Sequence, residues 1–310
     1  MTHLILAGTR PAPPQRQNIF PIRDYDLTAT LTSGQTFRWQ RENDSWAGVI
    51  DQHWVRLRSD NDVIIAETAE PVTCWNWLTD YLQIEKDLNA VLASFPNDEP
   101  MRAAVAASPG LRLLRQDPWE CLASFILSST KQIVQIKQII VLLAERFGNP
   151  LPVPAGFAPA FSFPTPARLA EATETGLRDC KMGFRAPYLL ATARAIAGGR
   201  PDLDRLKRLT LEQAREQLLQ LPGVGRKIAD CVLLFAGGFQ AAFPVDVWIM
   251  KALRELYFPR QRVGLPKLQQ FAAIHFGRNA GYAQQYLFHY WRVQNRRRTS
   301  HPSPRITNNP

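Results

Sequence analysis

The chain has 310 residues, of which 45% are hydrophobic and 21% charged, and its formal net charge is +10. This composition excludes a disordered or fibrous protein, and the length predicts two domains that share an interface. The excess of Lys and Arg predicts a polyanionic partner, because basic side chains that neutralise phosphates release condensed counterions.

The sequence also disfavours membrane, secreted and metal-binding classes. No apolar run reaches the roughly 20 residues of a bilayer span, and the start of the chain lacks the apolar region of a signal peptide. The four cysteines lack the paired spacing of a zinc or iron–sulfur site, so free thiols and no metal are expected. We expect an intracellular protein, in the cytoplasm or nucleoid of a bacterium or in the nucleus of a eukaryote.

The N-terminal third of the chain predicts an antiparallel sheet. Residues 1–18, rich in proline and polar side chains, are expected to form a flexible arm, with order beginning near Ile19. Strand-like patterns separated by polar turns lie at residues 27–31, 46–50 and 54–57. After Pro71 the apolar spacing becomes helical, so residues 19–106 predict a sheet domain with flanking helices.

Residues 107–292 predict a helical domain. Asp117 followed by Pro118 is typical of a helix start, because aspartate caps free amides and proline fits the first turn. Apolar helices are expected at residues 119–127 and 133–147. Six prolines make residues 150–166 a loop, whose phenylalanines need a surface to pack against. The basic residues 293–310 are expected to form a disordered tail.

The sequence LPGVGRKIADCVLLFA, at residues 221–236, predicts a tight turn between two helices. Gly223 and Gly225 allow positive φ and a close approach of the backbone around Val224. Amides of the turn and of the following helix start could bind a phosphate group without reading base sequence. A helix-hairpin-helix that binds DNA and a plain corner between two helices are both compatible with this pattern.

Two ionisable residues follow this turn. Lys227 falls in the first turn of the second helix, where the macrodipole disfavours a cation. Partial burial there would favour the free amine, which can attack carbon, whereas a solvated lysine that touches a phosphate is the alternative. Asp246, in the sequence PVDVW, precedes a helical run and fits an N-cap, a position that is compatible with a catalytic role.

These residues and their spacing resemble the helix-hairpin-helix (HhH-GPD) DNA glycosylase superfamily, and the lysine resembles its bifunctional branches. Three stretches are similar to the 8-oxoguanine DNA glycosylase/AP lyase family: SGQTFRW at residues 33–39, RLLRQDPWECLASFILSS at 112–129 and AQQYLF at 283–288. The resemblance implies an α+β fold, with an N-terminal antiparallel β-sheet domain packed on a larger all-α helix-hairpin-helix glycosylase domain.

The resemblance implies a lysine mechanism in base-excision repair. An oxidised guanine would be flipped out of double-stranded DNA, and Lys227 would attack its sugar C1′. Asp246 would stabilise the positive charge that develops on the sugar. The resulting Schiff base would permit strand nicking by β-elimination. No metal or organic cofactor is implied, and a monomer is expected.

The resemblance also implies how the base is held. The backbone carbonyl of Gly34 would accept a hydrogen bond from the protonated N7 of 8-oxoguanine, which ordinary guanine cannot donate. Gln284 would face the Watson–Crick edge of the base. Phe288 and Cys231 would contact its two faces.

The positions that would surround the base opposite the lesion depart from the family pattern. Three family asparagines are replaced by Thr130, Lys131 and Gln132. Gln135 replaces a family arginine, so these changes leave the opposite-base preference open. Arg185 matches the family's other arginine for this base, and Phe184 replaces a tyrosine that wedges into the base stack.

Trp248 stands where the family has a phosphate-contacting histidine, and Trp291 replaces the carboxylate partner of that histidine. We expect both tryptophans to be core residues. Two other functions are compatible with the sequence: a glycosylase for other damaged purines that uses Asp246 with water, and a non-catalytic helix-hairpin-helix module that binds DNA.

Overall fold

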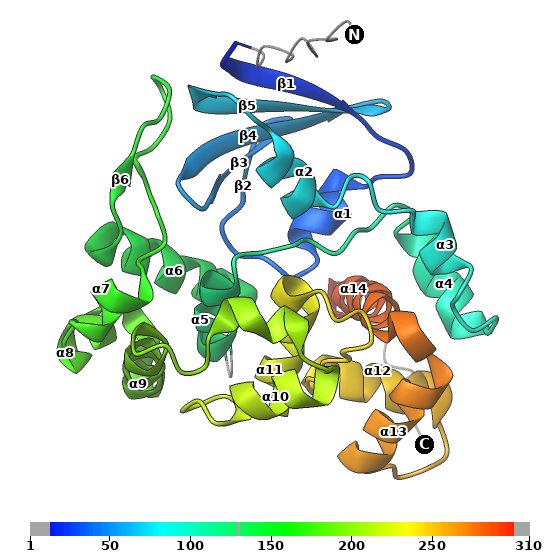
Figure 1. The fold of residues 1–310 in the computed structure, drawn as a ribbon. Helices are drawn as coiled ribbons and strands as arrows, with labels where there is room; N and C mark the ends of the chain where they lie inside the picture. Colours follow the sequence, from blue (N-terminus) through cyan, green and yellow to red (C-terminus); the bar gives the residue numbers. More distant parts are fainter. Residues whose placement is uncertain (1–12, 129–130, 301–310) are drawn as a thin grey trace, which may run out of the picture.

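A computed structural model describes residues 13–128 and 131–300, with side chains as far as residue 294 (Figure 1). Five antiparallel strands form the N-terminal sheet, in the order β1-β5-β4-β3-β2. They are β1 (Gln15–Pro21), β2 (Gln40–Glu42), β3 (Ser45–Ile50), β4 (His53–Asp60) and β5 (Val63–Val72). The strands expected at residues 46–50 and 54–57 are thus confirmed.

The remaining chain is mostly helical, and most of its helices lie below the sheet in Figure 1, which confirms the α+β fold. The first helices are α1 (Leu27–Thr32), α2 (Asn76–Leu82), α3 (Leu88–Leu92), α4 (Glu99–Ala107), α5 (Pro118–Leu127) and α6 (Ile133–Phe147). After β6 (Pro150–Leu151) and β7 (Ala160–Phe161) come α7 (Pro166–Ala170), α8 (Glu174–Leu177), η1 (Arg178–Met182), η2 (Gly183–Arg185) and α9 (Ala186–Ala197). The last are η3 (Leu203–Arg208), α10 (Leu211–Leu219), α11 (Arg226–Val232), η4 (Leu233–Gly237), α12 (Val247–Tyr257), α13 (Leu265–His275), η5 (Gly277–Asn279) and α14 (Ala280–Ser300).

The strand expected at residues 27–31 is wrong, because this segment forms α1. The Asp26 side chain accepts a hydrogen bond from the Ala29 amide at 2.8 Å and so caps the helix. A helix of under two turns is too short to display a 3.6-residue period. The cap, which acts locally, therefore outweighs the alternating pattern.

Both ends of the described chain are more ordered than expected. Gln17 and Asn18 pair with β5, so order begins before Ile19, because backbone pairing needs no apolar pattern. At the other end, α14 continues to Ser300 through the basic segment expected to be disordered. Buried side chains such as Tyr286 anchor that helix to the core. Residues 1–12 and 301–310 lie outside the described residues.

Helix α5 is the central helix of the domain and carries the predicted start signal. The Asp117 side chain accepts a hydrogen bond from the Glu120 amide at 2.7 Å, and Pro118 occupies the first helical position. Eight of the ten residues of α5 are buried. The helix packs against α6, α9 and α11, so it ties the elements around the candidate site together.

The proline-rich segment between α6 and α7 packs against the rest of the protein, as its phenylalanines predict. Its short strands β6 and β7 pair with each other. The Phe157 ring meets the Trp54 ring edge-on at 4.7 Å between centroids, and Phe163 is buried. The Trp119 indole donates a hydrogen bond to the Pro164 carbonyl at 2.9 Å, which fastens the segment to α5. None of the described helices is both long and apolar enough to span a bilayer.

Glu120 of α5 provides a pH-dependent contact between the two domains. Its carboxylate lies 3.9 Å from the Arg38 guanidinium, and the two side chains are 18% and 9% exposed. Burial raises the pKa of Glu120 to about 7, against the opposing effect of Arg38. The folded protein therefore binds a proton at the Glu120 carboxylate more tightly than the unfolded chain does.

We predict that the free energy of unfolding contains a contribution from Glu120 that is fully present below about pH 4.5 and is lost as pH rises through about 7. Its size should be on the order of 1 to 3 kcal/mol. Urea denaturation at several pH values measures it. Glu120→Gln should lack this contribution, and an identical pH dependence in both proteins would contradict the prediction.

Candidate active site

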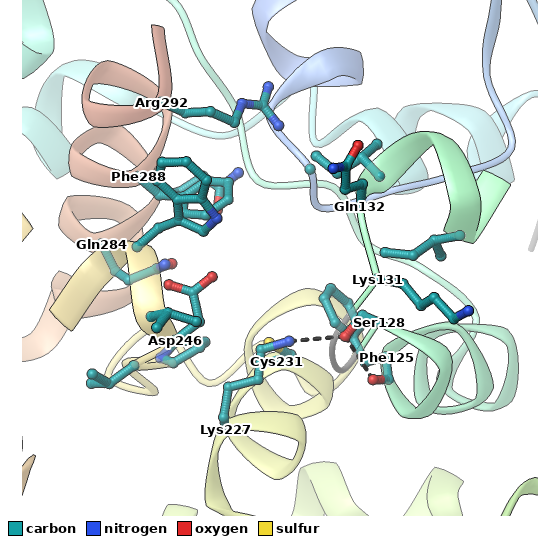
Figure 2. A pocket seen from close by; sticks show the side chains of 18 of the residues that line it. Phe125, Ser128, Lys131, Gln132, Lys227, Cys231, Asp246, Gln284, Phe288 and Arg292 are labelled. Carbon is teal, nitrogen blue, oxygen red and sulfur yellow. Dashed lines mark hydrogen bonds between the residues drawn. The ribbon is translucent and has the colours of Figure 1, made fainter. Parts of the chain in front are cut away.

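A pocket of about 750 Å³ opens where α5, α6, α11, α12 and α14 meet the loop before β2 (Figure 2). Among its lining residues are six that the sequence predicts as catalytic or base-binding: Gly34, Lys227, Cys231, Asp246, Gln284 and Phe288. These residues come from four separate parts of the chain. The fold therefore brings the two predicted catalytic residues and the four predicted base contacts into one cavity.

Lys227 is the second residue of α11, which follows the predicted hairpin turn. Gly223 has a φ of 76°, and a Cβ there would lie 2.8 Å from the Tyr188 side chain, so glycine is required at this turn. The Thr192 hydroxyl donates a hydrogen bond to the Pro222 carbonyl at 2.9 Å. Helix α9 thus holds the turn. At Gly225, no atom of the described residues lies within 4 Å of the place that a Cβ would occupy, so the backbone there is open to a close approach.

The two helices of the hairpin are joined by a buried ion pair. The Arg215 guanidinium of α10 donates a hydrogen bond to the Asp230 carboxylate of α11 at 2.6 Å. Both side chains are less than a tenth exposed. Breaking such a pair would leave an uncompensated buried charge, so it fixes how α11 presents Lys227 to the pocket.

The Lys227 amine is held by α5. Its Nζ donates a hydrogen bond to the Ser128 hydroxyl at 2.9 Å and lies 5.0 Å from the centre of the Phe125 ring (Figure 2). The Ser128 hydroxyl in turn donates to the Phe125 carbonyl at 2.7 Å. Because a hydroxyl has only one proton, Ser128 can only accept from Lys227. Sequence reasoning missed Ser128, although it stands at the end of the motif at residues 112–129.

Asp246 caps α12 and enters the same pocket. Its carboxylate accepts a hydrogen bond from the Ile249 amide at 2.8 Å, as the N-cap prediction requires. Burial raises the pKa of Asp246, while the Ile249 amide and the Lys227 charge act in the opposite direction. Within the described residues, no ion pair of 4.0 Å or less joins Asp246 to Lys227. The Lys227 amine is instead hydrogen-bonded to Ser128, and the Asp246 carboxylate points into the cavity (Figure 2).

The Gly34 loop is fixed from α14. The Gln285 amide donates a hydrogen bond to the Ser33 carbonyl at 3.0 Å, and the Arg292 guanidinium donates to the Thr32 carbonyl. Gly34 has a φ of 85°, and a Cβ there would lie 3.2 Å from both Phe288 and Arg292. Any larger residue would be strained and crowded at this wall of the pocket.

The remaining base-pocket residues combine apolar surfaces with one unsatisfied acceptor. Gln284 is 5% exposed, and its side-chain oxygen has no hydrogen-bond partner in the described part of the chain. A buried, unsatisfied acceptor costs about 1 to 3 kcal/mol, so a ligand with a matching donor would be favoured. Burial raises the pKa of Cys231 to about 12, so this residue stays a thiol.

The predicted DNA contacts lie partly outside the pocket. Phe184 is 53% exposed on η2, and the Arg185 guanidinium lies 4.6 Å from the centre of its ring. The backbone amide of Gln132 donates a hydrogen bond to the Gln135 side chain at 3.0 Å, which commits Gln135 to the start of α6. Thr130 lies outside the described residues, whereas Lys131 and Gln132 line the pocket.

The expectation of two core tryptophans holds for only one of them. Trp291 is buried, as expected. Trp248 is 43% exposed and lines the pocket, so its assignment to the core is wrong. It stands in the first turn of α12, where the helix start faces the cavity rather than the protein interior.

Two family models match the chain in succession. Residues 19–122 match the N-terminal domain of 8-oxoguanine DNA glycosylase. Residues 123–272 match the HhH-GPD superfamily of base excision DNA repair proteins. Together they account for the sheet domain and for most of the helical domain.

Relatives and solved structures are similar over most of their length. The N-glycosylase/DNA lyase OGG1 of Arabidopsis thaliana is 31% identical over 290 residues, which span 87% of this chain and 79% of the relative. The N-glycosylase/DNA lyase of Saccharomyces cerevisiae is 32% identical over 74% of this chain and 68% of its own. The 8-oxoguanine glycosylase/lyase of Clostridium acetobutylicum, in its apo form, has a TM-score of 0.83 at 32% identity and covers 89% of this chain and 96% of its own.

Proposed function

Because this chain belongs to the family of OGG1-type N-glycosylase/DNA lyases, we propose that Lys227 is its nucleophile and Asp246 its essential carboxylate. The chain is a DNA glycosylase and AP lyase of base-excision repair that acts on 8-oxoguanine. One observation carries the residue assignment: the amine and the carboxylate enter one cavity together with the unsatisfied Gln284 acceptor. A nucleophile, a charged stabiliser and a base-reading group are thereby within one substrate's reach.

The proposed substrate pose follows from the pocket. A base in the duplex cannot be reached, so 8-oxoguanine is flipped into the cavity, where its Watson–Crick edge donates to the Gln284 oxygen. Phe288 and Cys231 pack on its two faces. The Gly34 carbonyl accepts from N7–H, a single hydrogen bond worth on the order of 1 kcal/mol. Ordinary guanine presents a lone pair at N7 instead, so the energetic penalty for binding guanine exceeds the gain from the hydrogen bond to 8-oxoguanine.

The proposed chemistry divides base release and nicking into two steps. The Lys227 amine forms a bond to C1′ while the bond from C1′ to the base breaks, and the base leaves with the electron pair. Asp246 stabilises the positive charge that develops on the sugar. The C1′–O4′ bond then breaks and one proton of the amine passes to O4′, which opens the sugar ring and gives a protonated Schiff base. Removal of a C2′ proton leaves its electron pair to form the C2′–C3′ double bond, so the C3′–O bond breaks, the 3′ phosphate leaves and the strand is nicked.

The surface beyond the pocket is proposed to hold the duplex. The turn Gly223–Val224–Gly225 contacts the DNA backbone through its amides. Phe184 wedges into the base stack, and Arg185 beside it contacts the base opposite the lesion. A single copy of the chain contains all of these groups, so the enzyme is proposed to act as a monomer.

The test uses duplexes that contain 8-oxoguanine opposite each of the four bases, with base release and strand nicking measured separately. Release followed by nicking supports the proposal, and the four rates establish the opposite-base preference. Release of the base without nicking would support a glycosylase that uses Asp246 with water. Binding without release would support a non-catalytic module.

Ser128 should act as a positioning residue for Lys227. We predict that Ser128→Ala slows the single-turnover rate by about 10- to 100-fold, because the amine loses the acceptor that orients it. The dissociation constant for DNA should change little. Ser128→Thr keeps the hydroxyl and should restore most of the rate. Equal rates in Ser128→Ala and the unaltered enzyme would contradict this role.

A further inference from the structure

Exposed apolar side chains gather at the mouth of the active-site pocket. Four large hydrophobic residues that line the pocket are more than two-fifths exposed: Val134, Val247, Trp248 and Leu265. They come from the first turns of α6, α12 and α13. Contiguous apolar surface with polar neighbours typically marks a binding site. We call these four residues the apolar rim.

Trp248 is the largest member of the rim and has a basic neighbour. It stands two residues after Asp246, so its ring is at the edge of the cavity that contains the catalytic pair. Lys251, one helical turn further along α12, is exposed, and its Nζ lies 5.9 Å from the centre of the Trp248 ring. An aromatic face and an ammonium group therefore occupy adjacent places on one helix.

We infer that the N-terminal end of α12 is a nucleotide contact, in which Trp248 of the first turn packs against the extruded nucleotide and Lys251 of the second turn pairs with a flanking phosphate. This inference rests on the proposed function. The ring offers no charge to a phosphate. Because Phe288 and Cys231 cover the two faces of the base in the proposed pose, the apolar surface left for the Trp248 ring is that of the deoxyribose. Lys251 supplies the ionic contact that the ring cannot make.

The surroundings of the rim favour a nucleotide over a second protein as its occupant. The rim is continuous with the cavity that contains Lys227 and Asp246, because all four of its residues line that cavity, so a nucleotide held there lies next to Trp248. Lys131 and Arg292 line the same cavity. This concentration of positive charge fits a polyanion rather than an apolar protein surface.

The test is a salt series of duplex binding with 8-oxoguanine DNA. Trp248→Ala should weaken binding by about tenfold without altering the slope of log K against log salt, because a ring releases no counterions. Trp248→Phe should retain most of the affinity. Lys251→Gln should make the slope shallower by about 0.9, the value for one lost phosphate contact. Ile274→Ala, which removes a 76% exposed apolar side chain of α13 away from the pocket, is the matched control.

Three outcomes would overturn the inference: Trp248→Ala binding as tightly as Ile274→Ala, an unchanged slope in Lys251→Gln, or a changed sedimentation coefficient in Trp248→Ala. The last outcome would assign the rim to contacts between copies of the chain. Failure of the proposed function has a different signature. It would be seen in the unaltered enzyme, as the absence of a covalent adduct with borohydride, whatever the binding of the rim variants.

Discussion

Lys227→Gln should form no covalent adduct with 8-oxoguanine DNA in the presence of borohydride, whereas the unaltered enzyme should be trapped. The Schiff base needs a primary amine at the pocket, and glutamine has none. Strand nicking should fall by about 10³-fold or more, the scale on which enzymes respond to loss of a nucleophile. Gel mobility of the adduct and single-turnover nicking rates measure the two effects.

The control for this variant is a second lysine of the same cavity. Lys131 lines the pocket with Lys227, so Lys131→Gln removes one positive charge from the same region. It should still be trapped, although it should bind DNA less tightly because an ionic contact is lost. An adduct that persists in Lys227→Gln, or one that disappears in Lys131→Gln, would contradict the assignment of Lys227 as the nucleophile.

The parts of the fold that could be predicted from sequence depend on local chemistry. Asp117 caps an amide of its own turn and Pro118 fits the first helical position, so these two residues are enough to predict the start of α5. The glycines of the hairpin likewise specify a turn before α11. Local chemistry also explains the failure at α1. There the cap at Asp26 sets the structure, and the apolar alternation that suggested a strand does not.

The parts of the site that could not be predicted depend on contacts between distant residues. Ser128 lies 99 positions from Lys227 along the chain, and no periodicity or spacing encodes their hydrogen bond. Trp248 departs from the core prediction, which rests on the usual inward packing of a large aromatic residue in a helix. Its exposure follows from the place of α12, whose first turn forms the edge of a cavity that α5, α6, α11, α13 and α14 also line.

Asp246→Asn should separate the structural role of this residue from its chemical role. The carboxylate accepts the Ile249 amide as the N-cap of α12, and an asparagine side chain can accept the same hydrogen bond. The free energy of unfolding should therefore change by less than about 0.5 kcal/mol. Asp246→Ala removes the cap as well and should cost on the order of 1 kcal/mol.

The chemical role depends on the negative charge, which asparagine lacks. Charge developing on the sugar would lose its stabiliser, so Asp246→Asn should release 8-oxoguanine about 10²- to 10³-fold more slowly in single-turnover experiments. Asp246→Ala should be equally slow although it is less stable, because both variants lose the same charge. A rate for Asp246→Asn within a few-fold of the unaltered enzyme would reduce Asp246 to a helix cap. The same conclusion would follow if only Asp246→Ala, the less stable variant, released the base slowly. The cavity would then need another group to stabilise the charge on the sugar.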